Sequence, residues 1–186
     1  RPGFTLSKMI AQGVRNNPQA ELVLMEKHGL VTWGDTAEES YAKTIEMINK
    51  AEAYIEARVN EEQLFGGAKS KPLPAEERSR LAASLMPFIR GAVSDEKTMM
   101  LTFDDADDVL QFVSGKDAPQ LSQVGAACPD HLVHTKVVPL FIDWMPDASD
   151  AEGLRKLLAE GIAAYKEQYK AYFERNKHEG DVMFEA

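Results

Sequence analysis

The chain has 186 residues, 44% of them hydrophobic, and its 30 acidic and 21 basic residues give a formal net charge of −9. The length and apolar content suit one globular domain or slightly more, whereas the excess of acidic residues argues against a nucleic-acid partner. No apolar stretch reaches the roughly 20 residues that a membrane span needs, and the single cysteine, Cys128, implies no oxidising compartment. We therefore expect a cytoplasmic protein with neither a nucleic-acid nor a membrane partner.

The first part of the chain predicts a helix followed by a hairpin. Thr5 can cap a helix that ends before Pro18, because proline disfavours a helical residue ahead of it. Leu22–Met25 is a short apolar run, residues 30–33 are rich in β formers, and Gly29 lies between them. The expected structure is a strand, a turn and a second strand.

A long amphipathic helix is predicted to follow the hairpin. Thr36 and Glu39 have the spacing of a capping box, in which the two side chains satisfy backbone N–H groups at a helix start. Apolar side chains then recur on one face, to about Arg58, at Tyr41, Ile45, Ile48 and Ile55.

The composition then changes. Residues 65–72 are rich in glycine, lysine and other turn formers, which is typical of a linker. We therefore divide the chain into residues 1–60, a linker over 61–80, and residues 81–186. Pro74 suits the first turn of the helix that opens the second half.

The second half predicts alternating strands and helices. Residues 98–103 and 137–144 are rich in β formers, although Pro139 lacks a ladder donor and favours an edge strand. Residues 105–114 predict a short helix and residues 116–134 a loop. This order indicates a small α/β unit.

The last helix is the longest predicted element. Ser149 and Glu152 have capping-box spacing, and apolar side chains continue to about Asn176 at Leu154, Leu157, Leu158, Ile162, Tyr165, Tyr169, Tyr172 and Phe173. A small α/β unit does not easily cover so long a stripe. We therefore expect residues 150–176 to mediate contacts in a homo-oligomer or with a neighbouring domain.

His28 is the first candidate for chemistry, because it lies beside Gly29 between two predicted strands, where its side chain can face a cleft. Two interpretations remain open. A neutral imidazole there can ligate zinc, or it can simply hydrogen-bond a backbone group at a strand end, as single histidines commonly do.

Cys128, His131 and His134 form a second candidate group. Their Cys-x-x-His-x-x-His spacing can present ligands to a metal, with Asp130 orienting an imidazole. The alternative, which we favour, is a polar turn before a strand, since structural zinc usually has four ligands and no second Cys/His pair is present. If this loop lines a cleft, Lys136 is a candidate for contact with a substrate phosphate.

The stretch from Glu26 through the capped helix resembles the class II aldolase/adducin family, in which a His-Gly-aliphatic strand end precedes a small turn and a long amphipathic helix. HGLVTWGDTAEESYAKTIEMINKAE, ACPDHLVHTKVVPLFIDW and the tyrosine-rich last helix are similar to one branch, the bifunctional rhamnulose-1-phosphate aldolase/alcohol (lactaldehyde) dehydrogenases. The resemblance implies that His28 matches the third histidine of a catalytic zinc site. The family's catalytic site also needs a His-x-His pair and a glutamate base earlier in the chain, and no His-x-His precedes Glu26, so we assign no catalytic residue and interpret the chain as an internal fragment.

The resemblance also implies a fold and an activity. The expected fold is α/β: a partial class II aldolase-like α/β/α module, then a small α/β region with a long C-terminal helix. The expected activity of the parent protein is zinc-dependent cleavage of a sugar phosphate, rhamnulose 1-phosphate, to dihydroxyacetone phosphate and lactaldehyde. The implied NAD-dependent short-chain dehydrogenase lies outside this chain, which has no Gly-x-Gly-x-x-Gly. The rival hypothesis is a non-catalytic, adducin-like scaffold or oligomerisation segment.

Overall fold

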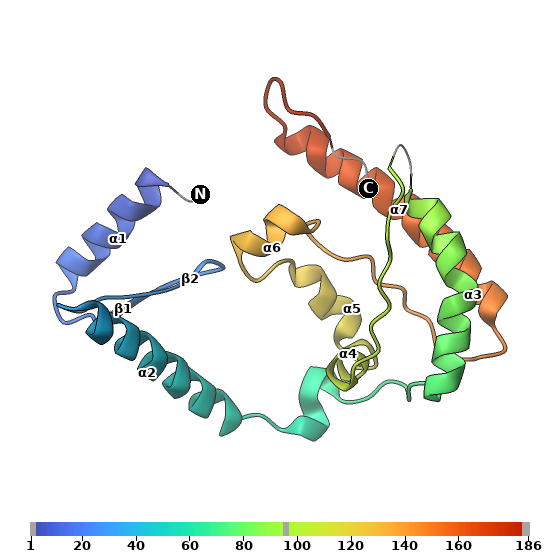
Figure 1. The fold of residues 1–186 in the computed structure, drawn as a ribbon, viewed down its shortest axis with the longest axis horizontal. Coiled ribbons are helices and arrows are strands. Elements are labelled where there is room, and N and C mark those ends of the chain that lie inside the picture. The colour runs from blue at the N-terminus through green and yellow to red at the C-terminus, as the bar shows by residue number, and fades with distance from the viewer. Residues whose placement is uncertain (1–2, 95–96, 184–186) are drawn as a thin grey trace. The chain divides into compact units, whose positions relative to one another are not determined.

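A computed structural model describes residues 3–94 and 97–183. The chain forms two compact units, one of Arg1–Glu61 with Gly125–Val137 and the other of Glu62–Val124 with Val138–Ala186. The order of the elements along the chain can be followed by colour in Figure 1.

The first unit opens with a helix and an antiparallel hairpin. Helix α1 spans Phe4–Asn16, strand β1 Leu22–Met25 and strand β2 Gly29–Thr32, with Leu22 opposite Thr32 and Met25 opposite Gly29. The predicted cap at Thr5 is wrong, because the helix already begins at Phe4 and no side chain caps it. The predicted hairpin is confirmed.

Helix α2 spans Ala37–Glu56 and packs beside β2. The predicted capping box is confirmed: the Thr36 hydroxyl accepts from the Glu39 N–H, and the Glu39 carboxylate accepts from the Thr36 N–H. Thr32 ties the strand to the helix, because its hydroxyl lies 2.6 Å from that of Thr44. The apolar face is still open, since Tyr41 is 70% exposed.

The second unit begins with a segment that the composition marked as a linker. A 3-10 helix, η1, spans Glu61–Gly66 and is followed by Ala68, which forms an isolated β-bridge with Gly115. The Phe65 ring meets that of Phe112 edge to face, with ring centres 5.1 Å apart. These contacts give the segment a local fold.

Helices α3 (Ala75–Val93) and α7 (Ala151–Asn176) pack together, and each contributes one buried apolar side chain, Leu85 from α3 and Ile162 from α7. The long last helix is confirmed at the predicted place. Its predicted capping box is wrong, because the cap is Asp150, whose carboxylate accepts from the Gly153 N–H at 3.1 Å.

The predicted loop over residues 116–134 is wrong. Besides α4 (Asp107–Val113), the chain forms α5 (Ala118–Leu121), η2 (Ser122–Val124) and α6 (Pro129–His134). A proline occupies the first turn of both α5 and α6, where its missing N–H costs nothing. Proline therefore starts two short helices here and does not mark a loop.

The predicted strands at residues 98–103 and 137–144 are also wrong. Both segments lack regular secondary structure, with bends at residues 137 and 138, and in the described residues no strand pairs with them. Side chains satisfy their carbonyls: Arg90 donates to the Met99 carbonyl at 3.0 Å, and the Tyr165 hydroxyl donates to the Val138 carbonyl at 2.5 Å. The β-rich composition therefore marks irregular chain here and not a sheet. The architecture as a whole remains the predicted mixed α/β class, with a small two-stranded sheet and a long last helix.

Candidate functional site

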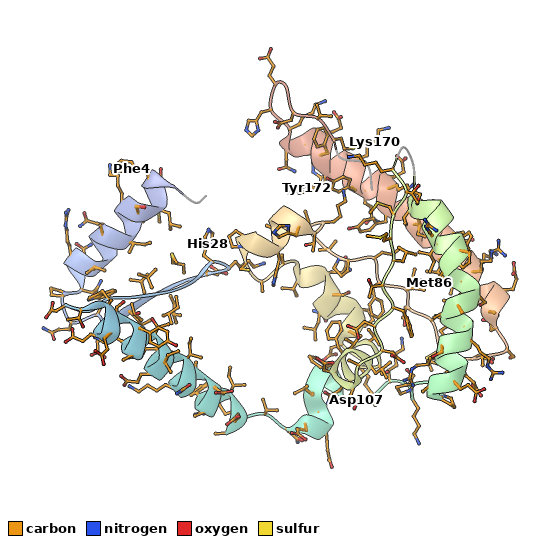
Figure 2. All side chains as sticks on the ribbon, viewed as in Figure 1. Phe4, His28, Met86, Asp107, Lys170 and Tyr172 are labelled. Carbon is orange, nitrogen blue, oxygen red and sulfur yellow. The ribbon has the colours of Figure 1, made fainter. Side chains whose placement is uncertain are left out.

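The turn that joins β1 to β2 carries the candidate histidine, which is labelled in Figure 2. Glu26, Lys27 and His28 form this turn, and the His28 N–H donates to the Met25 carbonyl at 3.0 Å. Lys27 has a φ of 55°, in the left-handed region, and Gly29 has a φ of 143°. Such a φ is uncommon for a residue with a side chain, and uncommon backbone conformations often occur near functional sites.

The contacts of the His28 ring indicate which tautomer it adopts. Its Nδ1 atom lies 3.2 Å from the Glu26 carbonyl oxygen. A carbonyl can only accept, so Nδ1 donates and carries the proton, which leaves Nε2 of the neutral ring as an acceptor. Nε2 is buried and has no hydrogen-bond partner.

His28 lines a groove of about 670 Å³ between α1 and the hairpin. Aliphatic and thioether side chains dominate the lining, and the described residues contribute neither lysine nor arginine to it. The other lining residues are Thr5, Leu6, Met9, Ile10, Gly13, Val23, Leu24, Met25 and Glu26. A groove of this composition suits the uncharged part of a ligand and offers no cation for a phosphate.

The histidine fits one position of a zinc site. A zinc-bound imidazole uses one ring nitrogen and commonly donates the other N–H to a carbonyl or carboxylate, which fixes the ring. His28 shows this arrangement, with Nδ1 on a backbone carbonyl and Nε2 buried and unpaired. Within residues 3–94 and 97–183, no three His, Cys, Asp or Glu side chains gather closely enough to hold a metal. This part of the chain therefore offers one ligand and not a complete site.

The second candidate group lies at α6. Cys128 is half-buried and precedes the helix, and its side chain makes no capping hydrogen bond. His131 and His134 are one turn apart on α6 and both are exposed. In the described residues, Cys128, His131 and His134 do not come together as a group of three ligands that could hold a metal ion. Lys136 follows the helix and is half-buried.

Sequence reasoning did not find the partners that give His28 its geometry. The Glu26 carbonyl belongs to the backbone, so the identity of the residue at position 26 does not indicate that its oxygen accepts from the His28 ring. The α1 side chains at the groove appeared only as an apolar helix face, and a pattern of that kind says nothing about which element it faces.

Comparison with known sequences identifies the class of protein. Residues 80–186, more than half of the chain, match the class II aldolase second domain, and residues 1–55 match the class II aldolase and adducin N-terminal domain. The chain belongs to the class II aldolase family, and its architecture is that of a partial class II aldolase α/β module.

A curated relative is the "Uncharacterized oxidoreductase YuxG" of Bacillus subtilis (strain 168), which is 59% identical over all 186 residues of this chain. The chain spans 27% of the length of that relative. No solved structure matches the chain. None of the helices formed by residues 3–94 and 97–183 is long and apolar enough to cross a membrane.

Proposed function

We propose that this segment belongs to a metal-dependent aldolase that cleaves a sugar phosphate, and that His28 supplies one imidazole ligand to the metal. The observation that carries the proposal is the buried, unpaired Nε2 atom of His28. A buried acceptor without a partner destabilises the fold by roughly 1–3 kcal/mol. A metal ion bound to Nε2 would satisfy this acceptor and remove that cost, which favours binding. A zinc ion held there acts as a Lewis acid on substrate oxygens.

The substrate that we propose is rhamnulose 1-phosphate, cleaved to dihydroxyacetone phosphate and lactaldehyde. An NAD-dependent short-chain dehydrogenase elsewhere in the longer protein would act on the aldehyde. The resemblance to the bifunctional branch supports this assignment, and so does the word oxidoreductase in the name of the relative that is 59% identical. The described residues of the groove beside His28 include no lysine or arginine, so we assign the phosphate to residues elsewhere in the protein.

The test is His28→Ala in the longer protein. Loss of an outer partner of a ligating histidine lowers metal affinity by about 10–100-fold, so loss of the ligand itself is expected to lower zinc affinity by at least that factor. Release of dihydroxyacetone phosphate from rhamnulose 1-phosphate should fall with it. Zinc content by mass spectrometry and a coupled assay measure the two quantities on the same preparations.

His178→Ala is the matched control, because His178 is exposed and its ring pairs with Asp181 in the last residues described. This variant should keep both zinc and activity. The 186-residue chain alone should release no product, because it offers one ligand and no assigned base. Unchanged zinc content in His28→Ala would remove His28 from the metal site. A longer protein that binds no zinc and cleaves no sugar phosphate would instead favour the scaffold hypothesis.

A further inference from the structure

The turn before the candidate ligand has an uncommon backbone. The residues with a side chain and a positive φ in the described chain are Lys27 and Phe65, and Lys27 immediately precedes His28. Glu26 has a negative φ, and the His28 N–H closes the turn onto the Met25 carbonyl. A negative φ followed by a positive φ is the combination of a type II turn, whose third residue is usually glycine or asparagine.

The turn type determines where the Glu26 carbonyl points. Types I and II differ mainly by a flip of the central peptide, which here joins Glu26 to Lys27. The oxygen of that peptide is the acceptor that lies 3.2 Å from Nδ1 of His28. If Lys27 returned to a negative φ, the peptide would flip and its oxygen would turn away from the ring.

We propose that Lys27 is a positioning residue: its left-handed backbone holds the Glu26 carbonyl on Nδ1 of His28 and so keeps Nε2 free of a proton and able to bind a ligand. The proton on Nδ1 matters because a histidine with its proton on Nε2 cannot ligate through that atom. The tautomer follows from the chain alone, and its use in metal binding rests on the proposed function. Lys27 acts through the backbone, so its own side chain need not touch the ligand.

The test uses variants that differ in their tolerance of a positive φ. Gly and Asn adopt the left-handed region readily, whereas β-branched residues are outliers there. Lys27→Gly and Lys27→Asn should therefore retain the turn, and Lys27→Val and Lys27→Ile should flip the peptide. Nitrogen-15 NMR of the histidine rings in the metal-free 186-residue chain reports which nitrogen of neutral His28 carries the proton, with His28→Gln to assign the signal.

We expect the Nδ1–H form in the natural chain and in the Gly and Asn variants, and a shift toward the Nε2–H form in the Val and Ile variants. In the longer protein, zinc affinity should fall about 10–100-fold in Lys27→Val and stay within about twofold in Lys27→Gly. Amide exchange in residues 22–32 shows whether the hairpin persists, and a merely structural role would not change the tautomer while the hairpin is intact.

Two results would overturn the proposal: the Nε2–H form in the natural chain, or the same tautomer in the Val and Gly variants with the hairpin intact. If Lys27→Val and Lys27→Ile unfold the hairpin, the proposal is still tested by the natural chain, Lys27→Gly and Lys27→Asn. All three must show the Nδ1–H form, and the Nε2–H form in any of them would overturn the proposal. A longer protein that binds no zinc although its His28 shows the Nδ1–H form would contradict the proposed function and leave the positioning role standing.

Discussion

At the scale of single residues, the effect of a substitution depends on what the new atoms would meet. A Cβ atom added at Gly115 would lie 2.6 Å from the Phe65 Cβ and 2.8 Å from the Phe65 carbonyl oxygen. One added at Gly161 would lie 2.7 Å from the Cδ1 atom of Ile142. The Phe65 carbonyl oxygen is backbone and the Phe65 Cβ is bonded directly to the backbone at Cα, so neither can yield easily, whereas the Ile142 Cδ1 is the end of a flexible side chain.

We therefore expect Gly115→Ala to lower the free energy of unfolding by about 1–3 kcal/mol, the usual cost of overpacking. Gly161→Ala should change it by less, because alanine in the middle of a helix is favoured over glycine by about 1 kcal/mol, which offsets the shift of Ile142. Chemical denaturation of both variants measures the difference. Equal destabilisation by the two substitutions would show that backbone contact at Gly115 is not the limiting factor.

At the scale of elements, α7 contacts the rest of its unit through apolar side chains, through the Tyr165 hydroxyl, and through the Arg155 guanidinium, which lies 4.9 Å from the centre of the Phe88 ring. Ile162 is buried, and the Tyr165 hydroxyl donates to the Val138 carbonyl at 2.5 Å. Part of the apolar stripe expected to bind a partner is therefore covered within the chain. The Tyr169 and Tyr172 rings are stacked near the end of the helix, and Tyr172 is 39% exposed. This end of α7 is where the proposed contact with another subunit or domain would form.

Burial, and to a smaller extent Tyr169, raises the pKa of Tyr165 above its ordinary value of 10.0. Because the pKa is raised in the folded chain, at a pH just above 10 the Tyr165 hydroxyl has lost its proton in the unfolded chain but still holds it in the folded chain. Stability from Tyr165 is thus complete below pH about 10 and is lost as the pH rises through the folded pKa. We expect the free energy of unfolding to decrease with pH in that alkaline range, and to decrease less steeply in Tyr165→Phe.

Unfolding titrations of the two proteins at several alkaline pH values give the comparison, and Tyr41→Phe is its control because Tyr41 is 70% exposed. Tyr165→Phe should also cost about 0.5–1.5 kcal/mol at neutral pH through the lost hydrogen bond. Identical pH slopes for the natural chain and Tyr165→Phe would contradict the assignment.

At the scale of the whole molecule, the two units differ in how much they bury. The buried residues of the described chain are Leu85, Gly115, Ala118, Ser122 and Ile162, and all belong to the second unit. The first unit has a confirmed hairpin and a well-capped α2, yet none of its described residues is buried. Burial of apolar surface is the main source of stability, so the first unit should open more readily than the second.

Hydrogen exchange followed by mass spectrometry should show this directly. Amides of α3 and α7 around Leu85 and Ile162 are expected to exchange most slowly, and those of residues 22–56 faster. Leu85→Ala should cost about 2–5 kcal/mol and accelerate exchange in α3 and α7 alone, whereas Ile48→Ala, at a side chain that is 50% exposed, should leave the second unit unchanged. Protection of the hairpin equal to that of α7 would contradict this division.

Much of the local structure could be predicted from the sequence because its causes are local. The capping box at Thr36, the hairpin around Gly29 and the periodicity of the last helix depend on neighbours within a few residues. His28 emerged as a candidate for the same reason, from a short motif at a turn. The class of fold followed from these features, and the family from the resemblance of the stretch around His28 to class II aldolases.

Only the tertiary structure showed those features that depend on residues distant in the sequence or on backbone atoms. Residues 98–103 and 137–144 have strand composition, but Arg90 and Tyr165 satisfy carbonyls of these segments and no described strand pairs with them. The tautomer of His28 depends on the Glu26 carbonyl, whose direction depends on the φ of Lys27. A residue type does not specify where a carbonyl points or which element covers an apolar face, so only the three-dimensional arrangement could show that Nε2 of His28 is buried and unpaired.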